Sequence, residues 1–178
     1  MPLSSPLKPT SVAPEWSSPW HHKVATLRKV ECVKIKRIVG VNPQTYVIES
    51  FESTSTNRIP TNKDRSCERS VQLTARMERE YAEFGGLRSE VYNTVRNAHL
   101  RTSCKFCQSV MHEVVMGDCM PTGRLLVFLG KHEGVMDTLA AFVNALLILV
   151  KRSGDARGCS GQAQVPQLLY NFLFDTVN

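Results

Sequence analysis

The stretch "SCKFCQSVMHEVVMGDCMPTGRLLVFLG", residues 103–130, is compatible with two mutually exclusive structures. Its apolar residues resemble the buried side of a helix, followed by a turn and an apolar run that Arg124 opens. Its thiols and imidazole resemble the ligands of a small zinc knuckle, which would be Cys104, Cys107, His112 and Cys119. The choice separates a metal-binding nucleic-acid module from a helical interaction domain.

The angular spacing of these residues favours the helix. Each residue of an α-helix turns by about 100°, so Cys107 and His112 would point about 140° apart. Zinc requires four ligands that converge at about 2.0–2.3 Å. Phe106, Val110 and Val114, in contrast, fall within about 80° of one another and form a core stripe. The sequence therefore predicts no metal site and no cofactor, with the cysteines as small buried apolar groups.

The composition is that of an ordinary globular protein. Among the 178 residues, 42% are hydrophobic and 21% are charged. Residues 1–20 hold five of the nine prolines and have no apolar periodicity, which predicts a flexible tail before a single helical domain at 21–178. The tail lacks the apolar core of a signal peptide, so we expect a reducing compartment and free thiols at all six cysteines.

The formal net charge of +6 makes nucleic acid or an acidic partner worth considering. The basic residues do not form a block, however. Their densest cluster is Lys34, Lys36 and Arg37, for which a solvated face is the favoured interpretation. No phosphate-binding loop, nucleophile elbow or pair of carboxylates in an evident cleft is present, so no enzyme is predicted.

Apolar spacing predicts helices over most of the chain. Residues 24–38 are predicted as a helix, with a strand across "VKIKRIV" at 33–39 as an open alternative, and residues 41–70 as a long loop. From residue 71 onwards all elements are predicted helical. Their predicted positions are a stripe through Leu73, Met77, Tyr81 and Phe84 that "FGGL" interrupts, then 87–98, 104–116, a helix opened by "TGRLLVFLG", 135–152, and a short helix over 167–177.

The most apolar segment, "VMDTLAAFVNALLILV" at 135–150, was weighed as a membrane span. It contains Asp137 and Asn144 and has 16 residues, whereas a bilayer requires about 20. A helix that is apolar on every side but too short to span belongs in a protein core. We therefore predict a central core helix and no transmembrane anchor.

The segment "VVMGDCMPTGRLLVFLG", residues 114–130, resembles the first homology motif of the Bcl-2 family of apoptosis regulators, a helix, a tight turn, then Gly-Arg before an apolar helix. "LRSEVYNTVRNAHL", residues 87–100, is similar to the segment after the third motif, most closely in the Bcl-2-related ovarian killer branch. The resemblance spans about 71–150. It implies an all-α, Bcl-2-like helical bundle with an apolar central helix or helical hairpin and a surface groove.

The resemblance also implies a partner-binding site. Arg124 would receive the aspartate of a partner helix as a charge-assisted contact, and Gly123 would let the partner backbone approach closely. The apolar positions that match the groove lining are Phe84, Val91, Tyr92, Val95, Met111, Val115 and Val127. For each of these taken singly, plain core packing is an equal alternative. The family pattern is broken at Pro121-Thr122, which replace Asn-Trp, and at Met77 and Tyr81-Ala82 in the third motif.

The function implied is that of an anti-apoptotic survival factor, typical of a viral homologue that acts on host proteins. It would sequester the helices of BH3-only proteins, and of effectors of the Bax and Bak type, in the cytoplasm or at mitochondria through its partners. The sequence does not decide whether a homodimer occludes the groove. Two alternatives remain: a pro-apoptotic member similar to the ovarian killer branch, and, from a different class, a basic nucleic-acid-binding protein, although no nucleic-acid partner is expected under the leading hypothesis.

Overall fold

The fold is mixed α/β, and the predicted all-α class is therefore wrong. The computed structural model describes residues 18–38, 45–53, 71–117, 132–153 and 158–175. These residues form three strands and five helices. In chain order the elements are α1 (Pro19–Lys29), β1 (Val30–Arg37), β2 (Thr45–Ser53), β3 (Val71–Glu80), α2 (Tyr81–Asn97), α3 (Lys105–Met116), α5 (His132–Arg152) and α6 (Ser160–Phe174).

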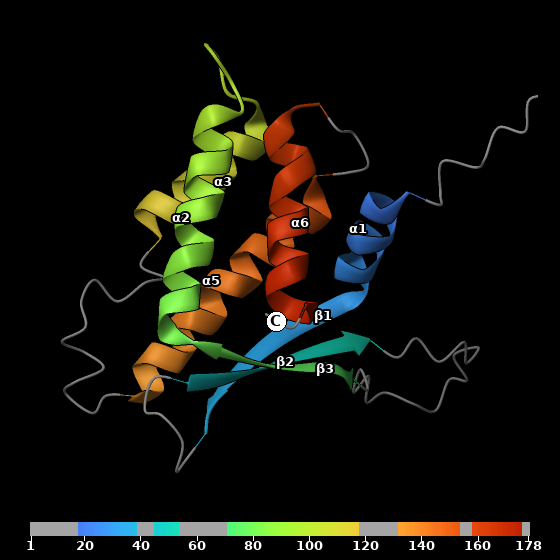
Figure 1. Cartoon of the computed structure of the whole chain (residues 1–178), viewed down its shortest axis with the longest axis vertical. Helices are drawn as coiled ribbons and strands as arrows, with labels where there is room; N and C mark the ends of the chain where they lie inside the picture. Colours follow the sequence, from blue (N-terminus) through green and yellow to red (C-terminus); the bar gives the residue numbers. More distant parts are fainter. Residues whose placement is uncertain (1–17, 39–44, 54–70, 118–131, 154–157, 176–178) are drawn as a thin grey trace, which may run out of the picture.

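The strands form one antiparallel sheet of order β1-β2-β3, and Figure 1 shows the helices gathered on one side of it. β1 has the alternation of a half-buried strand, with Val33 and Ile35 buried and Lys34 and Lys36 exposed. On the outer face the Lys36 Nζ atom lies 2.8 Å from a carboxylate oxygen of Glu49 on β2. The strand that the sequence left as an alternative at 33–39 is thus the correct one over most of its length.

The strands replace three predicted features. α1 ends at Lys29, so the helix predicted over 24–38 is wrong beyond that residue. β2 lies inside the predicted loop at 41–70. β3 occupies the start of the stripe that began at Leu73, because residues 75–80 alternate strictly between less and more exposed side chains. The predicted tail at 1–20 falls outside the described residues except for its last three.

The helices after β3 are largely as predicted. α3 and α5 confirm the helices expected at 104–116 and 135–152. α2 begins directly after β3 and continues through Gly85 and Gly86, so the predicted interruption there is wrong. Its first turn is closed by a capping box between Glu80 and Glu83, in which the Glu80 N–H donates to a Glu83 carboxylate oxygen at 2.6 Å. The helix expected from residue 122 lies outside the described residues.

α5 is the central helix of the core. By length and composition Gly134–Arg152 could also cross a membrane, as the core helix of a soluble protein often can. It packs on α1, β1, α3 and α6. Its fully buried side chains include Leu139, Phe142 and Leu146.

Asn144 on α5 covers the free edge of the sheet. Its side-chain oxygen accepts from the Val33 N–H at 2.9 Å, and its amide nitrogen donates to the Val33 and Ala140 carbonyls at 2.8 Å each. β1 is an edge strand, and an edge left unpaired under a helix would hold unsatisfied backbone groups. The one polar side chain in the middle of an apolar helix thus joins α5 to the sheet.

We expect Asn144→Ala to lower the free energy of unfolding by about 2 kcal/mol, because both backbone groups of Val33 lose their partner. Urea denaturation measures the change. Thr138→Ala is the matched control on the same helix, since its hydroxyl donates to the Gly134 carbonyl one turn earlier and does not reach the sheet, and it should change stability by less than about 0.5 kcal/mol. Equal losses for the two variants would contradict the bridging role of Asn144.

Candidate metal centre

Four potential metal ligands converge where three segments of the chain meet. His99 lies two residues beyond the end of α2, Cys104 is the N-cap of α3, Cys107 lies in the first turn of α3, and Cys159 is the N-cap of α6. The site therefore joins the segment after α2 to the N-termini of two helices that are far apart in the sequence.

The distances match those of a tetrahedral metal site. The Sγ atoms of Cys107 and Cys159 are 3.5 Å apart, and those of Cys104 and Cys159 are 3.7 Å apart. Ligands at about 2.3 Å from a tetrahedral zinc ion have sulfur atoms about 3.8 Å apart. All four ligand atoms, three sulfurs and one imidazole nitrogen, lie within 4.8 Å of one another. Small shifts would therefore place four ligands around one ion.

The helix N-termini donate hydrogen bonds to two of the sulfurs. The Cys104 sulfur accepts from the Cys107 N–H, and the Cys159 sulfur accepts from the Gln162 N–H, each at 3.5 Å. The positive ends of two helix dipoles thus face the sulfurs. Burial opposes ionisation of Cys104, but its hydrogen bonds with Cys107, Cys159 and His99 outweigh it and lower its pKa to about 7.

Cys107 behaves in the opposite way. Burial and hydrogen bonds to the neighbouring thiols, together with their charge, raise its pKa, so in the metal-free chain it remains a thiol. A divalent cation would reverse this, because a coordinating thiol is deprotonated outright. Cys104 thus ionises more readily than Cys107, which needs a metal ion to lose its proton.

Gly161 makes room for the sulfur atoms. A Cβ atom at this position would lie 2.6 Å from the Cys107 sulfur and 3.7 Å from the Cys159 sulfur. Any side chain there would push into the centre of the cluster, so the first turn of α6 has to carry glycine for the three thiols to meet.

The zinc knuckle considered from the sequence contained only half of this set. Cys104 and Cys107 belong to both, but His112 is exposed on α3 and Cys119 lies outside the described residues. α3 is continuous between the buried Cys107 and the exposed His112, so these two side chains point apart as predicted. Cys104 is not on the helix, however, and the missing ligands come from His99 and Cys159. The Cys-x-x-Cys spacing was the one available signal for this site.

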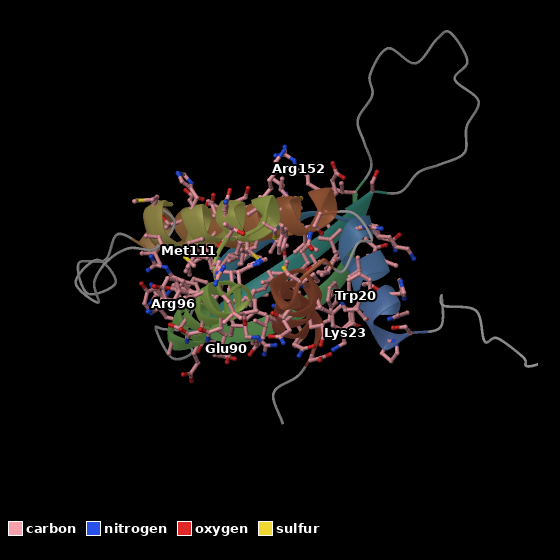
Figure 2. All side chains as sticks on the ribbon, turned by 90° about the horizontal axis from the view of Figure 1, so that it is seen from above. Trp20, Lys23, Glu90, Arg96, Met111 and Arg152 are labelled. Carbon is pink, nitrogen blue, oxygen red and sulfur yellow. The ribbon has the colours of Figure 1, made fainter. Side chains whose placement is uncertain are left out.

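Those of the predicted groove residues that the structure describes do not form one lining. Phe84, Val91 and Val95 are buried in the core. Tyr92 and Met111 are half-buried and Val115 is 47% exposed, while Gly123, Arg124 and Val127 lie outside the described residues. Figure 2 shows Met111 at the same end of the molecule as Arg96 and away from Trp20.

A shallow depression does lie between α2 and α3, with a volume of about 330 Å³. Its lining is Arg88, Ser89, Tyr92, Val114 and Val115. The Arg88 guanidinium donates to the Val114 carbonyl at 2.9 and 2.6 Å from two nitrogens, which fixes the end of α3 against α2. Two of the predicted groove residues, Tyr92 and Val115, therefore share one surface.

Comparison with protein families, with curated proteins and with solved structures finds no match for this chain. The Bcl-2 relationship stays a prediction from the sequence motifs. The function is therefore inferred from the chemistry of the described residues.

Proposed function

We propose that this chain is a zinc-binding, non-enzymatic domain whose metal ion is held by His99, Cys104, Cys107 and Cys159. The observation that carries the proposal is the convergence of three sulfur atoms and one imidazole nitrogen within 4.8 Å of one another. Three cysteines and one histidine are a common ligand set of structural zinc sites. Thiolate and imidazole ligands bind zinc in preference to magnesium or calcium.

The proposed role of the ion is structural. Four protein ligands complete a tetrahedral zinc and leave no open position for water or substrate, which separates structural from catalytic sites. Bound zinc would hold α6 against α3 at their N-termini and fix the segment between α2 and α3. The binding free energy of such a site adds to the folding free energy, since the unfolded chain does not hold its ligands together.

The test is metal analysis of the chain purified without added metal, followed by thermal unfolding. We expect one zinc per chain, and a lower melting temperature after chelation that returns when zinc is restored. A chain that purifies without stoichiometric zinc, binds none on titration and melts at the same temperature with and without chelator would overturn the proposal.

Gly161→Ala should weaken zinc binding at least tenfold, because the added methyl group meets the Cys107 sulfur. Competition with a chromophoric chelator measures the affinity. Gly85→Ala in α2 is the matched control, since a Cβ there meets nothing within 4 Å. It should leave zinc affinity unchanged and raise stability by about 0.5–1 kcal/mol. Wild-type affinity in the Gly161 variant would show that the thiols do not share one ion.

A second candidate function rests on the surface between α2 and α3. Val115 and Met116 are 47% and 70% exposed beside the depression that Tyr92 and Arg88 line. Exposed apolar groups beside a cation suit an apolar helix that carries an acidic residue. We propose that a protein partner binds this surface. The predicted sequestering of death-motif helices, in which Arg124 would contact their aspartate, is then a hypothesis that can be tested.

A labelled death-motif peptide tests this second function. We expect micromolar or tighter binding that falls at least tenfold on Val115→Asp and on Arg124→Glu. Ile148→Asp on α5, which is similarly exposed, controls for the added charge. If all three variants bind the peptide equally well, this surface is not the binding site. If the wild-type chain does not bind it, the function is excluded for that peptide class.

A further inference from the structure

We propose that hydrogen peroxide converts the metal centre into a disulfide between Cys104 and Cys159 and thereby releases the zinc ion. The inference rests on the proposed zinc-binding function and adds a modification and its consequence. It starts from a difference in accessibility within the site. The Cys107 side chain is 1% exposed, whereas Cys104 and Cys159 are both partly exposed. Two of the three cysteines are therefore open to a small oxidant in solution, and the third is not.

The two accessible sulfurs are also placed to react with each other. Their Sγ atoms are 3.7 Å apart, in contact but not bonded. A disulfide requires about 2.05 Å between the sulfurs. Both residues are N-caps, at the edge of α3 and α6 rather than inside a helical turn. The approach thus needs movement of two capping side chains and leaves the helices themselves in place.

The reaction is a two-electron oxidation in two steps. The Cys104 thiolate attacks one peroxide oxygen, so an S–O bond forms, the O–O bond breaks, and hydroxide leaves and takes a proton from solvent. The Cys159 thiolate then attacks the Cys104 sulfur, so the S–S bond forms and the S–O bond breaks, and a second hydroxide is protonated. Two thiolates are oxidised, hydrogen peroxide is reduced to two waters, and zinc keeps its charge.

Zinc is lost because two of its four ligands are consumed. His99 and Cys107 remain, and two ligands do not complete the tetrahedral shell that a structural zinc site requires. The disulfide links residues 55 positions apart, between the same helix ends that the metal joined. Oxidation thus replaces a metal link between α3 and α6 by a covalent one. The oxidised chain should keep its helices, while the segment from His99 to Cys104 loses its anchor at the imidazole.

The experiment treats the zinc-loaded full chain with hydrogen peroxide. Released zinc is followed with a chromophoric chelator, and disulfides are assigned by peptide mapping without reduction. We expect one zinc released per chain, a linked Cys104–Cys159 peptide in matching amount, and recovery of both thiols and zinc after dithiothreitol and zinc are added. A linked peptide that contains Cys107, or zinc released without any disulfide, would overturn the proposal.

The order in which two kinds of thiol are oxidised separates this inference from the function on which it rests. Cys32 on β1, a half-buried thiol outside the cluster, reports general oxidation. If the wild-type chain binds zinc and keeps it until Cys32 is oxidised, the switch is wrong and the zinc site stands. If it binds no zinc at the outset, the proposed function itself fails.

Discussion

Replacing Cys107 with serine is expected to abolish stoichiometric zinc binding and to lower the free energy of unfolding by about 3–4 kcal/mol at a free zinc concentration 100 to 1,000 times the dissociation constant. Cys107 is the most buried ligand, and its sulfur lies 3.5 Å from that of Cys159. A serine hydroxyl is a poor ligand for zinc in a thiolate site, since it is harder and stays protonated at neutral pH. Isothermal titration and urea denaturation in buffered zinc measure the two effects.

Two substitutions control for this experiment. Cys32→Ser removes a half-buried thiol from β1, far from the cluster in the sequence and not part of it. His112→Ala removes an exposed imidazole from α3, the same helix that carries Cys107. Both variants should bind one zinc with wild-type affinity. Loss of zinc in the His112 variant would favour the knuckle considered from the sequence over the site proposed here.

Arg79→Ala is expected to lower the free energy of unfolding by about 3 kcal/mol, the second large effect. The Arg79 side chain is buried although it carries a charge, and it closes the C-terminal end of α6. Its Nε donates to the Phe172 carbonyl at 3.1 Å, and one terminal nitrogen donates to the carbonyls of Asn171 and Asp175. The cation also offsets the negative end of the α6 dipole. Without the guanidinium, the Phe172 and Asp175 carbonyls lose this donor, whereas the Asn171 carbonyl keeps the Asp175 N–H at 3.0 Å.

Two further variants make the Arg79 prediction specific. Arg79→Lys should recover less than half of the loss, because a single ammonium group cannot reproduce a planar fork that reaches carbonyls of three residues. Arg76→Ala, three residues earlier on β3 and exposed, should change stability by less than about 0.5 kcal/mol. Urea denaturation of the three variants is sufficient. A small effect of Arg79→Ala would mean that water replaces the guanidinium at the end of α6.

The helices could be predicted from the sequence better than the sheet. α3 was predicted from the stripe of Phe106, Val110 and Val114, whose spacing is helical, and α5 from the length of its continuous apolar run. Spacing of four residues, as from Leu73 to Met77, is compatible with a helix but is also an even number, so it equally places side chains on one face of a strand. The decisive feature of β3 was the two-residue alternation from Ala75 to Glu80, in which a buried arginine stands where an apolar residue would be expected.

The metal centre could be predicted only in part, for a physical reason. The spacing of Cys104 and Cys107 indicates a pair of metal ligands. Zinc was rejected from the sequence because all four ligands were assumed to lie within one short segment. The remaining ligands come from a five-residue step back to His99 and from Cys159, 52 positions beyond Cys107. The packing of α6 against α2 and α3 brings these four ligands together. Apolar spacing alone gives no information about which helix N-termini lie side by side.

If three sulfurs and one nitrogen of this chain bind one zinc ion, X-ray absorption at the zinc edge of the purified protein should detect these atoms as its ligands. We expect three sulfur atoms at about 2.3 Å and one nitrogen at about 2.0–2.1 Å from the ion. A shell made only of oxygen and nitrogen atoms, or a protein in which zinc stays substoichiometric after titration, would contradict it.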